Sequence, residues 1–303
     1  MAESATAGRR LAAAAAAAVL LLALGALLWP HGRGGAGAVP LLVCDPSGRQ
    51  DRVEAVYEPL ARVLADATGR PVALQVLPRS GDLRAAAAAG PCFVLAPDGL
   101  ALDLGRDRFA PVAVGRGPVP RNLRPRSVLV WRRAAGHAAE PWRTRPDRTV
   151  LGDTLSLCAG GVFALGGGRA DPGLAAGPDP FDHGPVLHAA RLGGFDYALV
   201  RQWDADRFLA AGVLDEDAWG VRELTPPVPD IVVMAARALP RSQRLAAGEA
   251  LAAVGRDARG GEASDRLAAG LERLQLAGFN LLLDPDLDLV RGQLRGHWPR
   301  DAR

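Results

Sequence analysis

Short apolar runs alternate with amphipathic stretches through the first third of the chain. Residues 39–45, VPLLVCD, form an apolar run that ends in Asp-Pro-Ser-Gly turn chemistry, which is typical of a buried parallel strand. Apolar residues then recur at helical spacing from Leu60 to Ala67, and Gly69 is placed to end that helix. This alternation predicts a parallel α/β layer. Its expected members are strands at 39–45, 72–77 and 91–97 and helices at 59–69 and 81–89.

Two helix starts are expected from local chemistry. Glu58 precedes Pro59, and a residue before proline is disfavoured in the α conformation, so the first helix should begin at Pro59. Ser80 is the expected N-cap of the alanine-rich helix that follows the second strand.

A second, smaller α/β pattern follows a break in composition. The strand SVLVWRR at 127–133 leads into a stretch rich in proline, arginine and glycine, after which strand, glycine-rich loop, helix and strand recur between 149 and 200. A proline-bounded strand within 225–240 can carry the chain back to the first layer. The sequence therefore predicts two α/β lobes, the first completed by the C-terminal part. The expected division is a leader at 1–38, a first lobe at 39–130, a second lobe at 131–225, and a return with C-terminal helices at 226–303.

The N-terminus carries an export signal or a membrane anchor. Arg9 and Arg10 precede an uncharged apolar run at 11–29, whose length lies between a signal peptide's apolar region of about 7 to 15 residues and a spanning helix of about 20. Ala36-Gly37-Ala38 offers a small-residue cleavage site. The paired arginines favour a cytoplasmic N-terminus, so the body of the protein is expected in the periplasm or outside the cell.

Composition excludes several function classes. The 36 basic and 33 acidic residues give a net charge of +3 and are spread along the chain, so no nucleic-acid partner is expected. Every basic residue is arginine, which excludes a P-loop lysine or a Schiff-base lysine. The three cysteines show no zinc-ligand spacing and no disulfide framework, and neither a metal nor another cofactor is expected.

Six stretches of the chain share a common pattern with one protein family, in the same order. They are YEPLARVLADATGRPVALQVLPRSGDLRAAAAAG, PVAVGRGPVPRNLRPRSVLVWRR, VLGDTLSLCAGG, FDHGPVLHAARLGGFDYALVRQWD, TPPVPDIVVMAARALP and AGFNLLLDPDLDLVR. Together they resemble the phosphonate-, phosphite- and phosphate-type substrate-binding proteins of ABC transporters, which have the two-lobed type II periplasmic-binding-protein fold. The resemblance implies two α/β lobes joined by hinge strands, a small anionic ligand in the cleft between them, and ABC permease subunits as partners.

The stretch DTLSLCAGG resembles the family's ligand loop, whose hydroxyls and backbone amides hold an oxyanion at a helix N-terminus. Ser156 keeps a hydroxyl, whereas Leu157 and Cys158 stand where further hydroxyls are expected. Thr154 offers another hydroxyl nearby. The resemblance makes Thr154, Ser156 and Cys158 candidate ligand contacts. The alternative is that Thr154 and Ser156 only cap a helix.

Four further residues are candidate ligand contacts. His183 matches a family histidine that can reach the ligand, although a lone histidine is more often structural. Arg201 follows a predicted strand and could clamp a carboxylate in bidentate fashion, or lie on the solvated surface. Tyr57 is either a contact or a core residue, and Asp98 is either a contact or the first residue of an Asp-Gly turn.

The sequence leaves three functions open. The first is a solute-binding protein that captures a small anion for an ABC-type permease. The second is a membrane-tethered sensor or partner-binding module with the same fold and a degraded ligand site. The third, an enzyme with Ser156 or Cys158 as nucleophile, is disfavoured because no G-x-S-x-G, H-E-x-x-H or S-x-x-K motif occurs, and we expect no catalytic residues.

Overall fold

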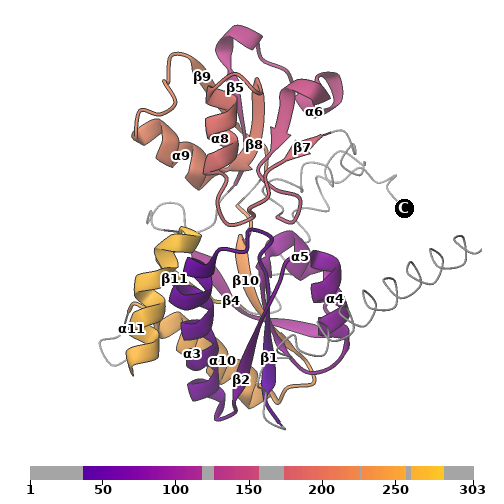
Figure 1. Ribbon diagram of the computed structural model, residues 1–303, viewed down its shortest axis with the longest axis vertical. Helices are drawn as coiled ribbons and strands as arrows, with labels where there is room; N and C mark the ends of the chain where they lie inside the picture. Colours follow the sequence, from indigo (N-terminus) through magenta and orange to yellow (C-terminus); the bar gives the residue numbers. More distant parts are fainter. Residues whose placement is uncertain (1–36, 118–125, 157–173, 226, 257–260, 283–303) are drawn as a thin grey trace, which may run out of the picture.

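The protein folds into two lobes, each built on its own sheet (Figure 1). The computed structural model describes residues 37–117, 126–156, 174–225, 227–256 and 261–282. The first sheet has six strands in the order β11-β4-β10-β3-β1-β2, and the second has five in the order β7-β6-β8-β5-β9. The predicted pair of α/β lobes is therefore confirmed.

The first sheet is sandwiched between two layers of helices. Alternate residues of β1 (Val39–Cys44) face opposite layers, with Leu41 and Val43 in one apolar cluster and Leu42 and Cys44 in the other. This two-sided burial explains the unbroken apolar run in the sequence. The other strands are β2 (Val72–Leu77), β3 (Phe93–Pro97), β4 (Phe109–Arg116), β10 (Ile231–Ala236) and β11 (Gly278–Leu281), and the main helices are α3 (Glu58–Thr68), α4 (Ser80–Ala88), α5 (Asp98–Asp103), α10 (Arg241–Ala253) and α11 (Gly261–Gly270).

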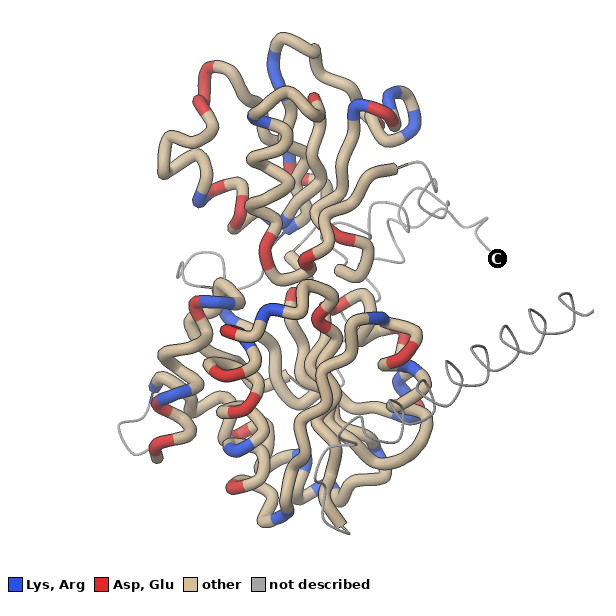
Figure 2. Tube along the Cα trace, viewed as in Figure 1, with Lys and Arg blue, Asp and Glu red and all other residues tan. Residues whose placement is uncertain are grey.

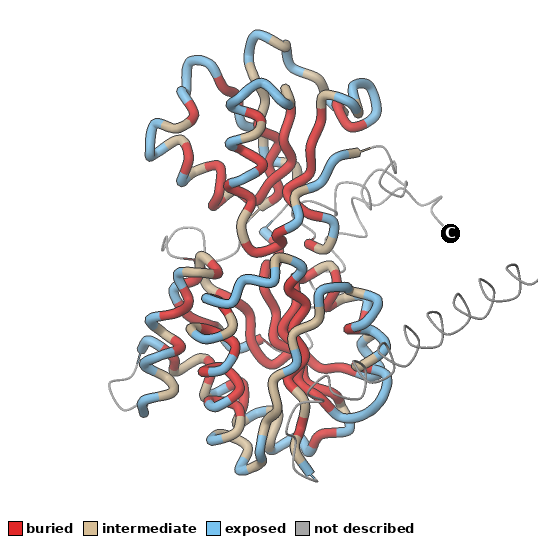
Figure 3. The backbone as a smooth tube through the Cα atoms, in the orientation of Figure 1, coloured by how far each residue is buried: buried red, intermediate tan, exposed pale blue. Residues whose placement is uncertain are grey.

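The second sheet has a larger apolar cluster on one face and a smaller one on the other. The strongly buried interior of both sheets is visible in Figure 3. Two helices, α8 and α9, pack on one face, and Trp142 of α6 lies in the cluster on the other. The strands are β5 (Ser127–Arg132), β6 (Thr149–Leu151), β7 (Ala175–Ala176), β8 (Tyr197–Arg201) and β9 (Trp219–Glu223), and the helices are α6 (Pro141–Thr144), α8 (Gly184–Arg191) and α9 (Gln202–Ala210).

Between the described strands, the chain passes from the first sheet to the second after β4 and returns between β9 and β10. The return strand is confirmed, because β10 lies between β3 and β4. The three strands of the predicted parallel layer, β1, β2 and β3, do pair in parallel. The return strand β10 runs antiparallel to β3 and β4, and β11 is antiparallel to β4, so the sheet as a whole is mixed. The expected lobe boundary after residue 130 falls inside β5, whose residues pair within the second sheet.

The first helix begins earlier than predicted. A short helix, α2 (Gln50–Arg52), continues through a π-helical turn (Val53–Tyr57) into α3, and Glu58 is helical, with φ −66° and ψ −46°. The prediction that the helix starts at Pro59 is therefore wrong. Because Pro59 has no N–H to donate, the widened turn just before it accommodates the missing hydrogen bond.

Other local predictions are refined. Ser80 is the first helical residue of α4, and the N-cap is Arg79, whose side chain makes no capping hydrogen bond. The second of the C-terminal helices, α11, ends at Gly270 and is followed by a 3-10 turn (Leu271–Leu274).

Some predictions concern parts of the chain outside the described residues. These are the leader with its apolar run at 11–29, most of the glycine-rich run including Leu157 and Cys158, and the tail beyond residue 282. Within the described ranges, none of the helices combines the length and the apolar character needed to cross a bilayer.

The contact between α11 and the π-helical turn generates a prediction about stability. A Cβ on Gly270 would lie 1.9 Å from the carbonyl oxygen of Ala55. Gly270→Ala should therefore push two helices apart and lower the free energy of unfolding by about 1–3 kcal/mol, measured by urea denaturation.

The matched control is Gly81→Ala in α4, where a Cβ meets nothing within 4 Å. This substitution should leave stability unchanged or raise it by up to about 1 kcal/mol. Equal effects of the two substitutions would show that the close approach at Gly270 does not matter.

Candidate functional site

Charged side chains are buried where the two lobes meet. Acidic and basic segments gather at this junction in Figure 2, close to the carboxyl ends of several strands, where ligands bind in open α/β sheets. In the described ranges, six aspartates, two arginines and one histidine have at most 6% of their surface exposed. They are Asp45, Asp98, Asp153, Asp179, Asp204, Asp230, Arg52, Arg201 and His183.

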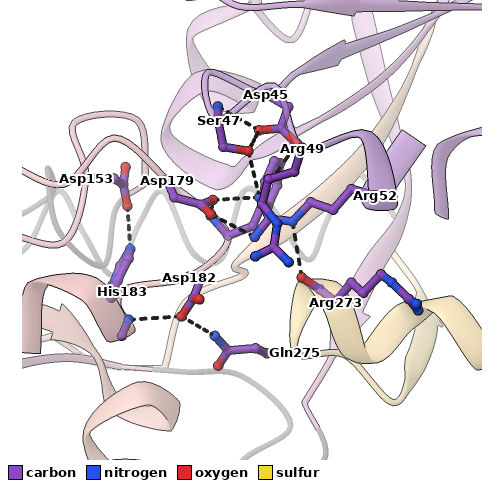
Figure 4. Close-up of polar contacts among 12 residues, drawn as sticks. Asp45, Ser47, Arg49, Arg52, Asp153, Asp179, Asp182, His183, Arg273 and Gln275 are labelled. Carbon is purple, nitrogen blue, oxygen red and sulfur yellow. Dashed lines mark hydrogen bonds and ion pairs between the residues drawn. The ribbon is translucent and has the colours of Figure 1, made fainter. Parts of the chain in front are cut away.

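An ion pair crosses between the lobes through Arg52. The Nη1 and Nη2 atoms of Arg52, in α2, donate to the two carboxylate oxygens of Asp179 in the second lobe, both at 2.8 Å (Figure 4). The guanidinium also donates to the Ser47 hydroxyl and to the Arg273 carbonyl, each at 3.3 Å. Burial lowers the pKa of Arg52, but the Asp179 carboxylate outweighs it and the pKa is raised. The side chain is therefore a fixed, charged fork.

A second buried arginine ties β8 to the start of β10. Arg201 donates through Nε to Asp204 at 3.0 Å, through Nη1 to Asp230 at 2.6 Å, and through Nη2 to the Phe181 carbonyl at 2.7 Å. Burial raises the pKa of Asp230 despite the neighbouring guanidinium. Burial also acts to raise the pKa of Asp204, but there the charge of Arg201 prevails and the pKa is lowered. Arg201 thus binds protein carboxylates and is not a surface residue.

The predicted ligand loop holds a carboxylate of its own. Asp153 accepts the backbone N–H groups of Leu155 at 2.5 Å and Ser156 at 2.6 Å through one oxygen. Its other oxygen accepts the Ser156 hydroxyl at 2.5 Å and the His183 imidazole Nε2 at 2.7 Å. These contacts outweigh burial and hold the pKa of Asp153 below its usual range. Ser156 and His183 therefore meet at Asp153.

The protonation of His183 follows from its second contact. Its Nδ1 accepts the backbone N–H of Arg201 at 3.1 Å, so Nε2 carries the proton that it donates to Asp153. Ser156 donates to Asp153 and not to His183, and neither ring nitrogen is left to accept the serine proton. The arrangement is not that of a nucleophile activated by a base.

The other predicted residues lie in different settings. Tyr57 is buried and donates from its hydroxyl to Asp45 at 2.6 Å, and burial strongly raises its pKa. Asp98 is buried, and its Oδ1 accepts the N–H of Gly99 at 2.9 Å. Thr154 is exposed. Cys158 lies outside the described residues.

The ligand loop touches the first lobe through its backbone. The Leu155 carbonyl accepts the N–H of Leu100 in α5 at 3.0 Å, and a Cβ on Gly99 would lie 2.4 Å from the same oxygen. Side chains of Phe181 and Trp203 from the second lobe pack into the apolar cluster of the first. The lobes are therefore joined by backbone, apolar and ionic contacts together.

The sequence did not single out Arg52, Asp179 or Asp230. Arg52 stands among other arginines in a polar segment, and the partners Arg52 and Asp179 are 127 residues apart. Asp230 directly precedes the return strand, and only the antiparallel course of β10 beside β3 brings it to the junction. In the described part of the chain, no three histidine, cysteine, aspartate or glutamate side chains are arranged to hold a metal.

Comparison with solved structures identifies the fold of the chain. No family model and no curated protein matches the chain. Among solved structures, XAC2383 from Xanthomonas citri, bound to a chloride ion, has a TM-score of 0.60 at 15% identity, over 86% of this chain and 97% of that one. The chain has the fold of the two-lobed periplasmic binding proteins.

Two further structures with this fold are similar. The binding-protein component of an ABC phosphonate transporter from Pseudomonas aeruginosa has a TM-score of 0.58 at 16% identity, over 86% of this chain and 85% of that one. PhnD1 from Prochlorococcus marinus, in complex with methylphosphonate, has a TM-score of 0.57 at 11% identity, over 86% and 98%. At these identities the likeness establishes the binding-protein fold alone.

The lowered pKa values of Asp153 and Asp204 predict acid sensitivity. A carboxyl whose pKa is lowered by folding stabilises the protein at pH values above its unfolded pKa of about 4, and this stability is lost as the pH falls through the folded value. The free energy of unfolding should therefore fall as the pH is lowered below about 4. Asp153→Asn should reduce the slope, measured by urea denaturation at a series of pH values.

The raised pKa of Asp230 has the opposite effect on the pH dependence of stability. Because Asp230 is present in both the unsubstituted protein and Asp153→Asn, it does not affect the difference between their slopes. The control is Asp66→Asn, at an exposed position on α3. An unchanged slope in Asp153→Asn would show that the Asp153 contacts do not stabilise the ionised form.

Proposed function

We propose that this chain is an exported solute-binding protein that captures a small anion, phosphonate-like or another oxyanion or organic acid, between its lobes for an ABC-type permease. One observation carries the proposal: two donor sets at the junction each bind a carboxylate. The fork of Arg52 binds that of Asp179, and the loop N–H groups, Ser156 and His183 bind that of Asp153. Forked guanidinium groups and converging N–H donors suit oxyanions in general.

The fold supports the proposal. PhnD1 is a structure with bound methylphosphonate, and XAC2383 has been solved with chloride and with ATP. In two-lobed binding proteins the lobes separate and close about the crossing segments. In this chain the crossings follow β4 and β9, and on our proposal the lobes part at the buried ion pairs. Export rests on the apolar run at 11–29, which would serve as a cleaved signal or an anchor in the inner membrane.

A partner-binding or sensing module is the second candidate function. The six buried aspartates outnumber the two buried arginines in the described ranges, and both arginines already bind protein carboxylates. A lobe junction whose arginines are already paired with protein carboxylates can hold together without a ligand. If no anion binds, a partner-binding or sensing role is favoured over uptake of a solute.

A thermal-shift screen of the purified chain tests the proposed function. Methylphosphonate, phosphite, phosphate, sulfonates and carboxylates are compared with sodium chloride at the same ionic strength. A ligand at a hundredfold excess over its Kd should stabilise the protein by about 2.7 kcal/mol. A folded protein whose transition is moved by none of these anions would contradict anion capture.

The ligand loop is tested with a matched pair of hydroxyl deletions. In the structure the Ser156 hydroxyl donates to Asp153, and on our proposal an anion that enters the loop accepts this hydrogen bond instead. Ser156→Ala removes the hydroxyl and should weaken binding of the best anion about tenfold or more, measured by calorimetry. Thr154→Ala removes the exposed hydroxyl two residues earlier and should leave affinity unchanged. The reverse ranking would assign the ligand contact to Thr154.

A further inference from the structure

The Arg52 guanidinium is held in place by groups other than Asp179. Its Nε donates to the Arg273 carbonyl and its Nη1 donates to the Ser47 hydroxyl, and both of these groups belong to the first lobe. The fork therefore keeps its orientation if the Asp179 carboxylate leaves. A preorganised fork is what a bidentate oxyanion site requires.

The Asp179 carboxylate makes its other contact within the second lobe. Its loop lies between β7 and α8, and apart from Arg52 its carboxylate accepts the backbone N–H of Phe181 at 2.9 Å. About 9% of its side chain is exposed, whereas that of Arg52 is fully buried. Separation of the lobes would carry Asp179 away from Arg52.

The local charge is preserved if an external anion replaces Asp179. A second carboxylate, Asp45, lies 3.6 Å from Nη1 of Arg52 and is itself held by Tyr57 and Ser47. Removal of Asp179 leaves two fork N–H groups without acceptors. A monoanionic carboxylate or phosphonate supplies the same charge and the same pair of oxygens.

We propose that Arg52 is the first lobe's oxyanion clamp, with Asp179 as an internal carboxylate that occupies the clamp until a small carboxylate or phosphonate exchanges with it. This inference rests on the proposed function for the ligand class. It adds the residue that binds the anion and the residue that competes with it. Arg201 does not play this part, because its three donors hold two carboxylates and a carbonyl in a fully buried cluster.

Removal of the competitor tests the clamp. Asp179→Ala should destabilise the protein, and sodium acetate or methylphosphonate should restore its melting temperature in a saturable manner at constant ionic strength. In the double variant Arg52→Gln/Asp179→Ala, the anions have no fork to bind, so the affinity for acetate should fall at least tenfold. Equal rescue of the two variants, or no rescue of Asp179→Ala, overturns the proposal.

The chain offers a matched control. Arg148 and Asp196 form a bidentate pair within the second lobe, with both hydrogen bonds at 2.9 Å, away from the lobe junction. Asp196→Ala should lose stability without gaining saturable rescue by acetate. Rescue of Asp196→Ala at the same concentrations would show a general salt effect and would overturn the clamp.

A second variant covers the case in which Asp179→Ala does not fold. Asp179→Asn keeps the size of the side chain and removes the competing charge. Calorimetry should show that it binds methylphosphonate at least tenfold more tightly than the unsubstituted chain. Equal or weaker binding overturns the proposal.

The two proposals fail in distinguishable ways. If the unsubstituted chain binds no anion but Asp179→Ala binds acetate through Arg52, anion capture and the exchange with Asp179 fail, while the assignment of Arg52 as an oxyanion-binding fork stands. If the unsubstituted chain binds an anion and neither Asp179 variant changes that affinity, anion capture stands and the clamp fails.

Discussion

Burial of charge between the two lobes is the constraint on which the rest of the structure depends. Removing a carboxylate or a guanidinium from water costs several kcal/mol per group unless a partner and hydrogen bonds compensate. Here Arg52 meets Asp179 across the junction, and Arg201 meets Asp204 and Asp230. Breaking such a pair from one side typically costs about 3–5 kcal/mol, so these contacts favour one relative placement of the lobes.

The topology of the chain brings these charged groups together. The return strand β10 passes between β3 and β4, and this places Asp230 beside Arg201 at the end of β8. The π-helical turn and the helices around it place Arg52 beside Asp179. The same junction carries the backbone contact from the Leu155 carbonyl to α5. The contacts that join the lobes are therefore made largely by the same residues that form the candidate site.

The junction is acidic, and this distinguishes it from a simple anion trap. Asp153 occupies the loop whose N–H groups and hydroxyl were predicted to hold a ligand, and His183 has both nitrogens engaged. An anion that enters must compete with a protein carboxylate, which lowers its apparent affinity and makes the competing residue a determinant of selectivity. The same self-sufficiency would allow the lobes to stay closed as a partner-binding module.

The sequence by itself determined the elements and the general position of the site. Apolar runs predicted most of the buried strands of both lobes and the return strand, because these patterns reflect local burial. Strands β4, β7, β9 and β11 were not predicted. Pro111 interrupts the apolar run of β4, and β9 ends in the charged residues Arg222 and Glu223. The resemblance singled out Ser156 and His183, and the position after a predicted strand singled out Arg201. The structure buries all three near one another.

The tertiary structure alone decided which charges meet. Arg52 and Asp179 are 127 residues apart, and Arg201 and Asp230 are joined only because the chain returns between two strands of the first sheet. Local patterns cannot specify such pairs, because an arginine or aspartate that becomes buried in an ion pair looks the same in the sequence as one that stays exposed. Their partners are fixed when two separately packed lobes come into contact and exclude water from the charges between them.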